Sequence, residues 1–150
     1  MSATPDRVEK QQLLCAIGQV QHDEIKDLDR AVDAYLNVTS LNRDNVTALD
    51  ALSRIYDERG DHSQAFDSMS QLSKLLTDTQ QVVDLRYRMG RLLDEKLGDR
   101  ASAVDAYQSA IDVEPGHLLS LEAMRKIHLD AGDWLAAAKT LEQESQYQQQ

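Results

Sequence analysis

The five-residue stretch AVDAY occurs twice in this chain, as Ala31–Tyr35 and as Ala103–Tyr107, 72 positions apart. When the two copies are aligned, Gly18 lies opposite Gly90, each 13 residues before its alanine. The correspondence therefore extends well beyond the five identical letters. It indicates either that one long segment was duplicated whole or that a shorter repeat, with less similar residues, lies between the copies.

The shorter period is present. Between the copies, Leu52-Ser53-x-x-Tyr56 precedes Ala65-x-x-x-Met69, and the same order of residue types recurs after the second copy. The anchor positions in the first half of each unit are spaced by 35, 37 and 35 residues, and they are Gly18, Ser53, Gly90 and Arg125. The 72-residue spacing between the two copies therefore corresponds to two units of about 36 residues.

Each unit has the pattern of two helices joined by a turn. Apolar residues three or four positions apart fill both halves, which is typical of amphipathic helices. The halves are separated by Gly-Asp pairs at residues 60–61, 98–99 and 132–133. Glycine can end one helix in a left-handed conformation and aspartate can cap the next. A small residue opens the second helix of every unit, and these residues are Ala31, Ala65, Ala103 and Ala137. We expect the following first helices to begin near Asn45, Thr79 and the Pro115-Gly116 stretch.

This pattern resembles the tetratricopeptide repeat, a 34-residue helix–turn–helix unit with L-G-x-x-Y in its first helix, A-x-x-x-F in its second and a proline near its end. The resemblance extends from residue 11 to about 149, and the third unit fits best, with Met89-Gly90, Ala103-x-x-x-Tyr107 and Pro115. The chain departs from the pattern in several places. No unit has the first-helix tryptophan, and Arg125 stands where a small residue is expected.

The resemblance implies an all-α fold, a right-handed alpha-alpha superhelix of about four degenerate repeats whose first helices line a concave face. After a lead-in at residues 1–10, we expect repeats at about 11–45, 46–82, 83–117 and 118–150. The family pattern places Tyr35, Tyr107 and Trp134 as packing aromatics. Near the end, Glu144 and Ser145 replace apolar residues. We expect them to make an exposed end face more polar.

Composition excludes several classes of function. The formal charge of −10 argues against nucleic acid, which needs a clustered basic surface, and against an anionic membrane. No apolar run approaches the roughly 18 residues of a membrane helix. The amino-terminal residues show no secretion signal, and Cys15, the single cysteine, fits a reducing, cytoplasmic compartment. The sequence therefore predicts a soluble cytoplasmic protein.

The chain shows no pattern typical of an enzyme. It lacks HExxH, CxxC, G-x-S-x-G and a glycine-rich phosphate loop, and its four histidines occupy unrelated repeat positions. We therefore expect no catalytic residue, no metal site and no cofactor. Cys15 has no histidine beside it in a recognisable arrangement and is interpreted as an ordinary small residue.

By the resemblance, a partner peptide would bind along the first helices. There, a basic residue in each of the last three units is followed four positions later by an acid. The further acids Asp57, Asp84 and Asp94 leave an acidic excess. The candidate groove residues are His22, Asp23, Asp50, Arg54, Asp57, Glu58, Asp84, Tyr87, Arg91, Asp94, Glu95, Glu122, Lys126 and Asp130. In the first two units Gln12, Cys15, Gln19 and Thr47 belong to the same lining.

Two interpretations of these charges stay open. In the first, an acidic groove with interspersed arginines binds a basic or mixed-charge peptide. In the second, Arg54–Glu58, Arg91–Glu95 and Lys126–Asp130 are pairs that support exposed helices, with Asp50–Arg54 and Glu122–Lys126 extending two of them.

The sequence thus predicts a non-catalytic protein–protein interaction module or scaffold that binds a protein or peptide segment. The alternative is a structural segment, for self-assembly or spacing within a longer array, with no groove ligand. No polar capping helix is visible. The ends would therefore belong to a longer array, be covered by self-association, or be soluble enough through their polar substitutions.

Overall fold

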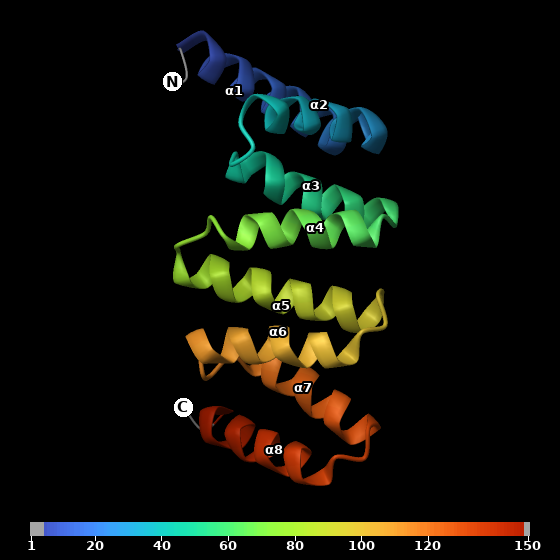
Figure 1. Ribbon diagram of the computed structural model, residues 1–150, viewed down its shortest axis with the longest axis vertical. Coiled ribbons are helices and arrows are strands. Elements are labelled where there is room, and N and C mark those ends of the chain that lie inside the picture. The colour runs from blue at the N-terminus through green and yellow to red at the C-terminus, as the bar shows by residue number, and fades with distance from the viewer. Residues whose placement is uncertain (1–4, 149–150) are drawn as a thin grey trace. The chain divides into compact units, whose positions relative to one another are not determined.

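The computed structural model describes residues 5–148, which form eight α-helices and one short π-helical turn (Figure 1). No strand occurs in this part of the chain. The elements are α1 (Pro5–Val20), η1 (Gln21–Ile25), α2 (Leu28–Leu41), α3 (Val46–Arg59), α4 (His62–Ser73), α5 (Thr79–Glu95), α6 (Arg100–Val113), α7 (Leu118–Asp130) and α8 (Trp134–Gln148).

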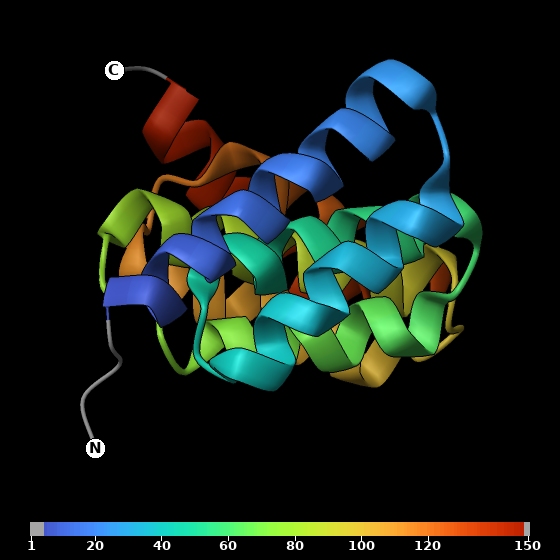
Figure 2. The same cartoon turned by 90° about the horizontal axis from the view of Figure 1, so that it is seen from above.

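These helices belong to two compact units, one ending at Leu76 and the other beginning at Thr77. The first unit contains α1 to α4 and the second α5 to α8. Within each unit, consecutive helices pack in pairs as antiparallel hairpins, and the second helix of the leading hairpin packs on the first helix of the next. Figure 2 shows the first pair, in which the chain runs along α1 and returns along α2. The predicted all-α fold of helix–turn–helix repeats is confirmed.

The turns inside the hairpins follow the predicted chemistry. Gly60, Gly98 and Gly132 have φ angles of 91°, 67° and 74°, a left-handed conformation that glycine adopts without a Cβ clash. Aspartate follows each glycine. The carboxylates of Asp99 and Asp133 accept hydrogen bonds from the backbone N–H groups of residues three positions later, at 3.1 and 3.2 Å. That hydrogen bond holds the pKa of Asp99 below its ordinary value.

The first hairpin makes the same turn without glycine. Lys26 occupies the left-handed position with a φ of 64°, the only positive φ of a non-glycine residue in the described chain. The π-helical turn η1 leads from α1 into this turn. Asp27 then caps α2 by accepting a hydrogen bond from the N–H of Arg30 at 3.0 Å.

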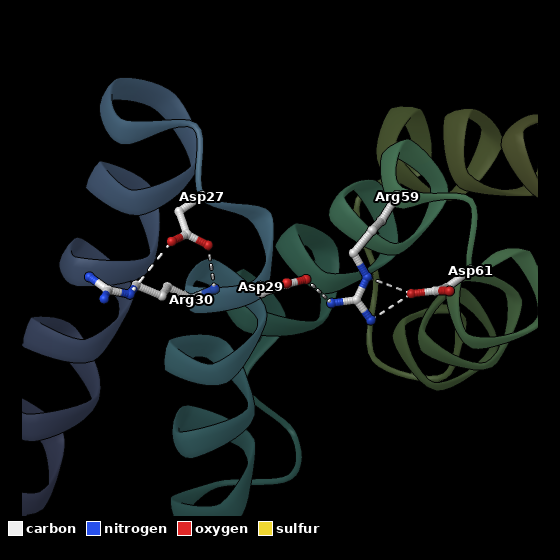
Figure 3. A network of polar contacts seen from close by, with 5 residues as sticks. All are labelled: Asp27, Asp29, Arg30, Arg59 and Asp61. Carbon is white, nitrogen blue, oxygen red and sulfur yellow. Dashed lines mark hydrogen bonds and ion pairs between the residues drawn. The ribbon is translucent and has the colours of Figure 1, made fainter.

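An ion-pair network joins consecutive hairpins in the first unit (Figure 3). Arg59, at the end of α3, lies 3.0 Å from Asp29 in the first turn of α2 and 2.6 Å from Asp61. The Asp61 hydrogen bond is the main reason that the pKa of Arg59 lies above its ordinary value. The second unit has the opposite arrangement of charges, with Arg100 in the first turn of α6 and Asp130 at the end of α7, 3.1 Å apart.

The interior of each hairpin is built on small residues. Ala31, Ala65 and Ala103 have no exposed surface and Ala137 is 2% exposed, as expected for positions where two helices approach closely. In the first and third repeats, glycine on the first helix faces tyrosine on the second. A Cβ built on Gly18 would lie 2.7 Å from the ring of Tyr35, and one on Gly90 would lie 2.6 Å from that of Tyr107.

The aromatic predictions hold for the two tyrosines and fail for the tryptophan. Tyr35 and Tyr107 are buried at 5% and 1% exposure, whereas Trp134 is 67% exposed. Trp134 is the first residue of α8, and the second unit has no neighbouring element that covers it within the described residues. The expectation that Trp134 packs in the core is therefore wrong.

Helix α1 begins at Pro5, ahead of residue 11, where the first repeat was expected to start. Proline suits the first position of a helix because its missing N–H would have no partner there. Residues 1–4 of the expected lead-in, and Gln149 and Gln150, lie outside the described residues. The repeat boundaries themselves stay a prediction.

The contact between Gly90 and Tyr107 predicts that Gly90→Ala destabilises the protein. Alanine improves helix propensity by about 1 kcal/mol. Its methyl group would however overlap a fully buried ring, and such overpacking costs about 1–3 kcal/mol. We expect urea denaturation to show a net loss of about 1 kcal/mol in the free energy of unfolding. In a Tyr107→Leu background the same substitution should cost nothing, and an equal cost in both backgrounds would contradict the steric explanation.

The conformation of Lys26 predicts that Lys26→Gly stabilises the first unit. A left-handed lysine costs about 1–2 kcal/mol, and glycine adds about 0.5–1 kcal/mol of unfolded-chain entropy. The expected net gain in unfolding free energy is about 0.5–1 kcal/mol, measured by urea denaturation. Gly60→Lys should lose a similar amount through the backbone alone, because a Cβ at Gly60 would meet no atom within 4 Å. If both variants are destabilised, the left-handed turn does not explain the effect.

Candidate functional site

The first unit contains an open groove with a volume of about 810 Å³. One wall is formed by α1 and η1, through Gln11, Gln12, Cys15, Gln19, His22 and Asp23. Asn45 and the side chains Thr47, Asp50 and Arg54 of α3 form the other wall, and Tyr35 of α2 contributes between them. The groove thus lies between the first helices of two consecutive repeats.

The lining combines apolar surface with polar side chains, most of which are uncharged. Glutamine and asparagine amides can each donate and accept hydrogen bonds, so they can contact both the N–H and the C=O groups of a polypeptide backbone. Gln11 and Asn45 already bond to each other across the groove, from Asn45 Nδ2 to Gln11 Oε1 at 3.1 Å. Asn45 also caps α3 by accepting from the N–H of Ala48. The position of this wall is therefore fixed by the start of the helix.

Tyr35 is held against α1 because Gly18 has no side chain to displace its ring. Burial raises the pKa of the Tyr35 hydroxyl, with smaller contributions from Cys15 and Asp23. Burial also raises the pKa of the Cys15 thiol. Both groups are consequently neutral hydrogen-bonding groups at physiological pH, and neither adds charge to the groove.

His22 connects the two walls at the end of the groove. Its Nδ1 lies 3.1 Å from Asp23 Oδ1, and its Nε2 lies 2.7 Å from Glu58 Oε2 on α3. The two carboxylates make this end of the groove negative. Further along, Arg54 pairs with Asp50 at 3.1 Å. The charges of that pair offset each other.

The structure therefore brings together four of the predicted groove residues, His22, Asp23, Asp50 and Arg54, and places Glu58 beside them. Their role in binding stays a prediction. Asp57, by contrast, lies 3.1 Å from His62 at the start of α4. The candidates Asp84, Tyr87, Arg91, Asp94 and Glu95 lie on α5, and Glu122, Lys126 and Asp130 lie on α7, in the second unit.

Two of the expected helix-supporting pairs are wrong. Arg54 bonds to Asp50 and leaves Glu58 to His22, while Lys126 lies 3.5 Å from Glu122 and leaves Asp130 to Arg100. Arg91–Glu95 forms as expected, at 3.2 Å. The failures share a cause, since each acid at the end of a first helix lies within reach of a side-chain nitrogen from another element, His22 for Glu58 and Arg100 for Asp130.

The acidic excess expected from three further residues stays a prediction, although each of the three acids has a partner in the structure. Asp94 pairs with Arg100 at 3.1 Å, Asp57 meets His62, and Asp84 accepts a hydrogen bond from the Gln80 amide at 3.0 Å. Tyr87 packs in an aromatic cluster, with ring centroids 5.8 Å from Tyr107 and 5.5 Å from His117. The ring of Tyr87 is therefore part of the packing of its hairpin.

The groove also contains residues that the sequence did not single out. Tyr35 was assigned to packing alone, and Gln11 and Asn45 were not included in the lining. Ala16 and Ala51 add two small side chains that leave the groove open. The spacing of Gln11 and Asn45, 34 residues apart, could have indicated the pairing, because one repeat separates them.

In the second unit, the departure at Arg125 has a structural explanation. Arg125 Nε lies 2.7 Å from Glu144 Oε2, and their side chains are only 25% and 9% exposed. Repeat alignment places Ser53 at the position of Arg125 and Val38 at that of Glu144. A buried ion pair thus replaces a small residue and an apolar one. The expectation that Glu144 makes an exposed end more polar is wrong, because Glu144 is buried.

Other types of site find no support. In residues 5–148 no group of three or more histidine, cysteine, aspartate or glutamate side chains is arranged to hold a metal ion. No helix of that segment combines the length and apolar character needed to cross a bilayer.

The helical hairpins and their glycine–aspartate turns define a helical-repeat protein. Residues 84–117 match the tetratricopeptide repeat model. A sequence comparison with curated proteins gives no significant match. Residues 84–117 thus belong to the tetratricopeptide repeat family, and the fold of the described chain is the tetratricopeptide-repeat fold.

Solved structures support this fold. A crystal structure of MamA is similar with a TM-score of 0.77 and 18% identity, covering 93% of this chain and 78% of that one. The N-terminal domain of stress-induced protein-1 from C. elegans has a TM-score of 0.73 and 14% identity, over 83% and 99% of the two chains. YrrB, described as a TPR protein with an unusual peptide-binding site, has a TM-score of 0.69 and 16% identity, over 89% and 66%.

The Arg125–Glu144 pair predicts that the stability lost on replacing Glu144 depends on whether Arg125 is still present. Glu144→Ala leaves the guanidinium partly buried without its partner and should lower the free energy of unfolding by about 2–3 kcal/mol. The double variant Arg125→Ser/Glu144→Val carries the residues found at these positions in other repeats. We expect its stability to lie within about 1 kcal/mol of the parent. Urea denaturation of both variants tests this, and an equal loss in the two would contradict the ion-pair explanation.

Proposed function

We propose that this chain is a non-catalytic interaction module that binds an extended peptide segment of a partner protein in the groove of its first unit. The observation that carries the proposal is the groove itself, which is open, has both apolar surface and uncharged polar side chains, and is lined by first helices of consecutive repeats. Its volume of about 810 Å³ lies within the range of ligand pockets.

The length of the groove supports a peptide rather than a small compact ligand. Its lining runs along α1 from Val8 to Gln19 and continues to Asp23. At a rise of 1.5 Å per residue this span is about 22 Å. An extended chain advances about 3.3 Å per residue, so roughly six or seven residues would fit along the groove.

The lining supports contact with the peptide backbone. Gln12 and Gln19 lie on the α1 wall, and Thr47 faces the same groove from α3. These side chains offer donors and acceptors without charge, which suits N–H and C=O groups of an extended segment. Backbone contact of this kind tolerates many sequences, so side-chain selectivity has to come from elsewhere in the groove.

The carboxylates at the His22 end supply that selectivity. Asp23 and Glu58 lie on either side of the His22 ring, and each is at least half exposed. A lysine or arginine at one end of the peptide would meet both carboxylates. The Arg54–Asp50 pair further along the groove can bind a peptide side chain of either charge. The ligand class is therefore a mixed-charge peptide with a basic end.

Similarity of fold supports the same role. YrrB, which shares the tetratricopeptide-repeat fold with this chain, has a peptide-binding site in the words that describe its structure. The alternative, a spacer or assembly segment with an empty groove, predicts that no peptide is selected.

The test is a random peptide library displayed on phage and selected on the immobilised chain, with a selected peptide then titrated by fluorescence anisotropy. Ala16 lines the groove and is exposed, so Ala16→Trp fills the groove without entering the core. We expect this variant to weaken binding by at least about tenfold, or about 1.4 kcal/mol. Selected peptides should carry lysine or arginine near one end.

Ala101→Trp is the matched control, because Ala101 is an exposed alanine on α6 of the second unit. It should bind the selected peptide as tightly as the parent does. Circular dichroism of both variants establishes that they remain folded. Equal affinity of Ala16→Trp and the parent, or failure to enrich any peptide, would overturn the proposal.

A further inference from the structure

Helix α1 carries a row of exposed apolar side chains outside the groove. Leu13 is 65% exposed, and Ile17 and Val20 are each 49% exposed. Their spacing of four and three residues places them on one face of the helix. None of the three lines the groove. Contiguous apolar surface of this kind on a helix marks an interaction site more often than a solvated face.

The equivalent positions of the next repeat are buried. Aligning Gly18 with Ser53 places Leu13, Ile17 and Val20 opposite three residues of α3 that are 0%, 3% and 1% exposed. These residues are Ala48, Leu52 and Ile55. Helix α3 differs from α1 in having the second helix of a preceding hairpin, α2, packed against it. The exposed face of α1 thus has the pattern that receives a second helix of a tetratricopeptide hairpin.

The same comparison holds in the second unit. The corresponding residues of α7, where α6 packs, are Ser120, Met124 and Ile127, at 0%, 6% and 6% exposure. Two independent interfaces within the chain therefore bury this face in the same way.

Helix α8, a second helix, has an exposed apolar face. Trp134 is 67% exposed and Leu141 is 47% exposed, and their spacing of seven residues places them on one face of the helix. Aligning Ala31 with Ala137 places Leu141 at the position of Tyr35, which is 5% exposed in α2. The chain thus contains one exposed face that normally receives a second helix and one exposed second helix.

The internal interfaces also have ion pairs, and their equivalents on the two outer faces can be read from the repeat alignment. Asp29–Arg59 and Arg100–Asp130 each join the start of a second helix to the end of the next first helix, and each pair is 30 residues apart. The alignment places Trp134 and Leu135 of α8 at the positions of Arg100 and Asp29, and Asp23 and Glu24 of η1 at those of Asp130 and Arg59. At this end of the contact the α8 side is therefore apolar and the η1 side is acidic.

We propose that α8 of one copy of this chain docks on the Leu13–Ile17–Val20 face of α1 of a second copy, in the manner of α2 on α3. The contact is heterologous, so it joins copies head to tail and leaves one free face of each kind at the ends of an open chain. Each copy has a formal charge of −10, and salt that screens this repulsion strengthens the association.

The experiment is analytical ultracentrifugation of the full chain over a concentration series at low and high salt. The variants are Ile17→Glu on the α1 face and Leu141→Glu on the α8 face, where Leu141 stands at the position of the buried Tyr35. Each places a charge in the proposed contact at a side chain that is about half exposed or more in a single copy. Leu97→Glu is the control, since Leu97 is 38% exposed and lies on neither face. Circular dichroism establishes that all three are folded.

The parent and Leu97→Glu should increase in mass with concentration, by about twofold or more, and more strongly at high salt. Each of the other two variants should stay monomeric alone. Mixed in equal amounts they should form a dimer and nothing larger, because Ile17→Glu retains its α8 face and Leu141→Glu retains its α1 face. A monomeric parent at all concentrations would overturn the proposal. So would a mixture that fails to pair, or self-association of Leu141→Glu alone, which a symmetric α1–α1 contact predicts.

Discussion

Two helices approach each other closely in every hairpin, and this approach limits what the remaining positions can accept. It requires a residue no larger than alanine where the helices cross, and all four second helices have a buried alanine there. In the first and third hairpins the requirement is stricter, because the rings of Tyr35 and Tyr107 pack directly against glycines. Volume, rather than polarity, decides which residues fit at these crossings.

The same contact shapes the candidate site. Because Gly18 has no side chain, the ring of Tyr35 packs against α1. The ring lines the groove between α1 and α3 without being pushed into its open space. The groove then remains open between two walls of amide and carboxylate side chains. The packing of a hairpin and the shape of the proposed binding surface are therefore one arrangement, and a change at Gly18 would affect both.

Charges on the first helices are used mainly to connect neighbours. Arg59 and Arg100 each join consecutive hairpins, and the acid and the base exchange helices between the two cases. His22 contacts Glu58, which the sequence pattern had paired with Arg54, and His62 contacts Asp57. The apolar outer faces of α1 and α8 lack such pairs. This difference distinguishes surfaces that are covered within a unit from surfaces that remain exposed.

The helices, their hairpins and their turns could be predicted from the residues alone, because these elements depend on local features. Apolar spacing sets a helix, glycine at residues 60, 98 and 132 allows a left-handed turn, and alanine marks each crossing. Several groove residues could also be predicted, since their register on a first helix follows from the repeat. Only the packing between helices decides that Asp94 and Asp130 both contact Arg100 and that Glu144 is buried against Arg125. The same packing leaves Trp134 exposed. Such outcomes depend on distances between side chains of different helices, and the repeat pattern does not specify those distances.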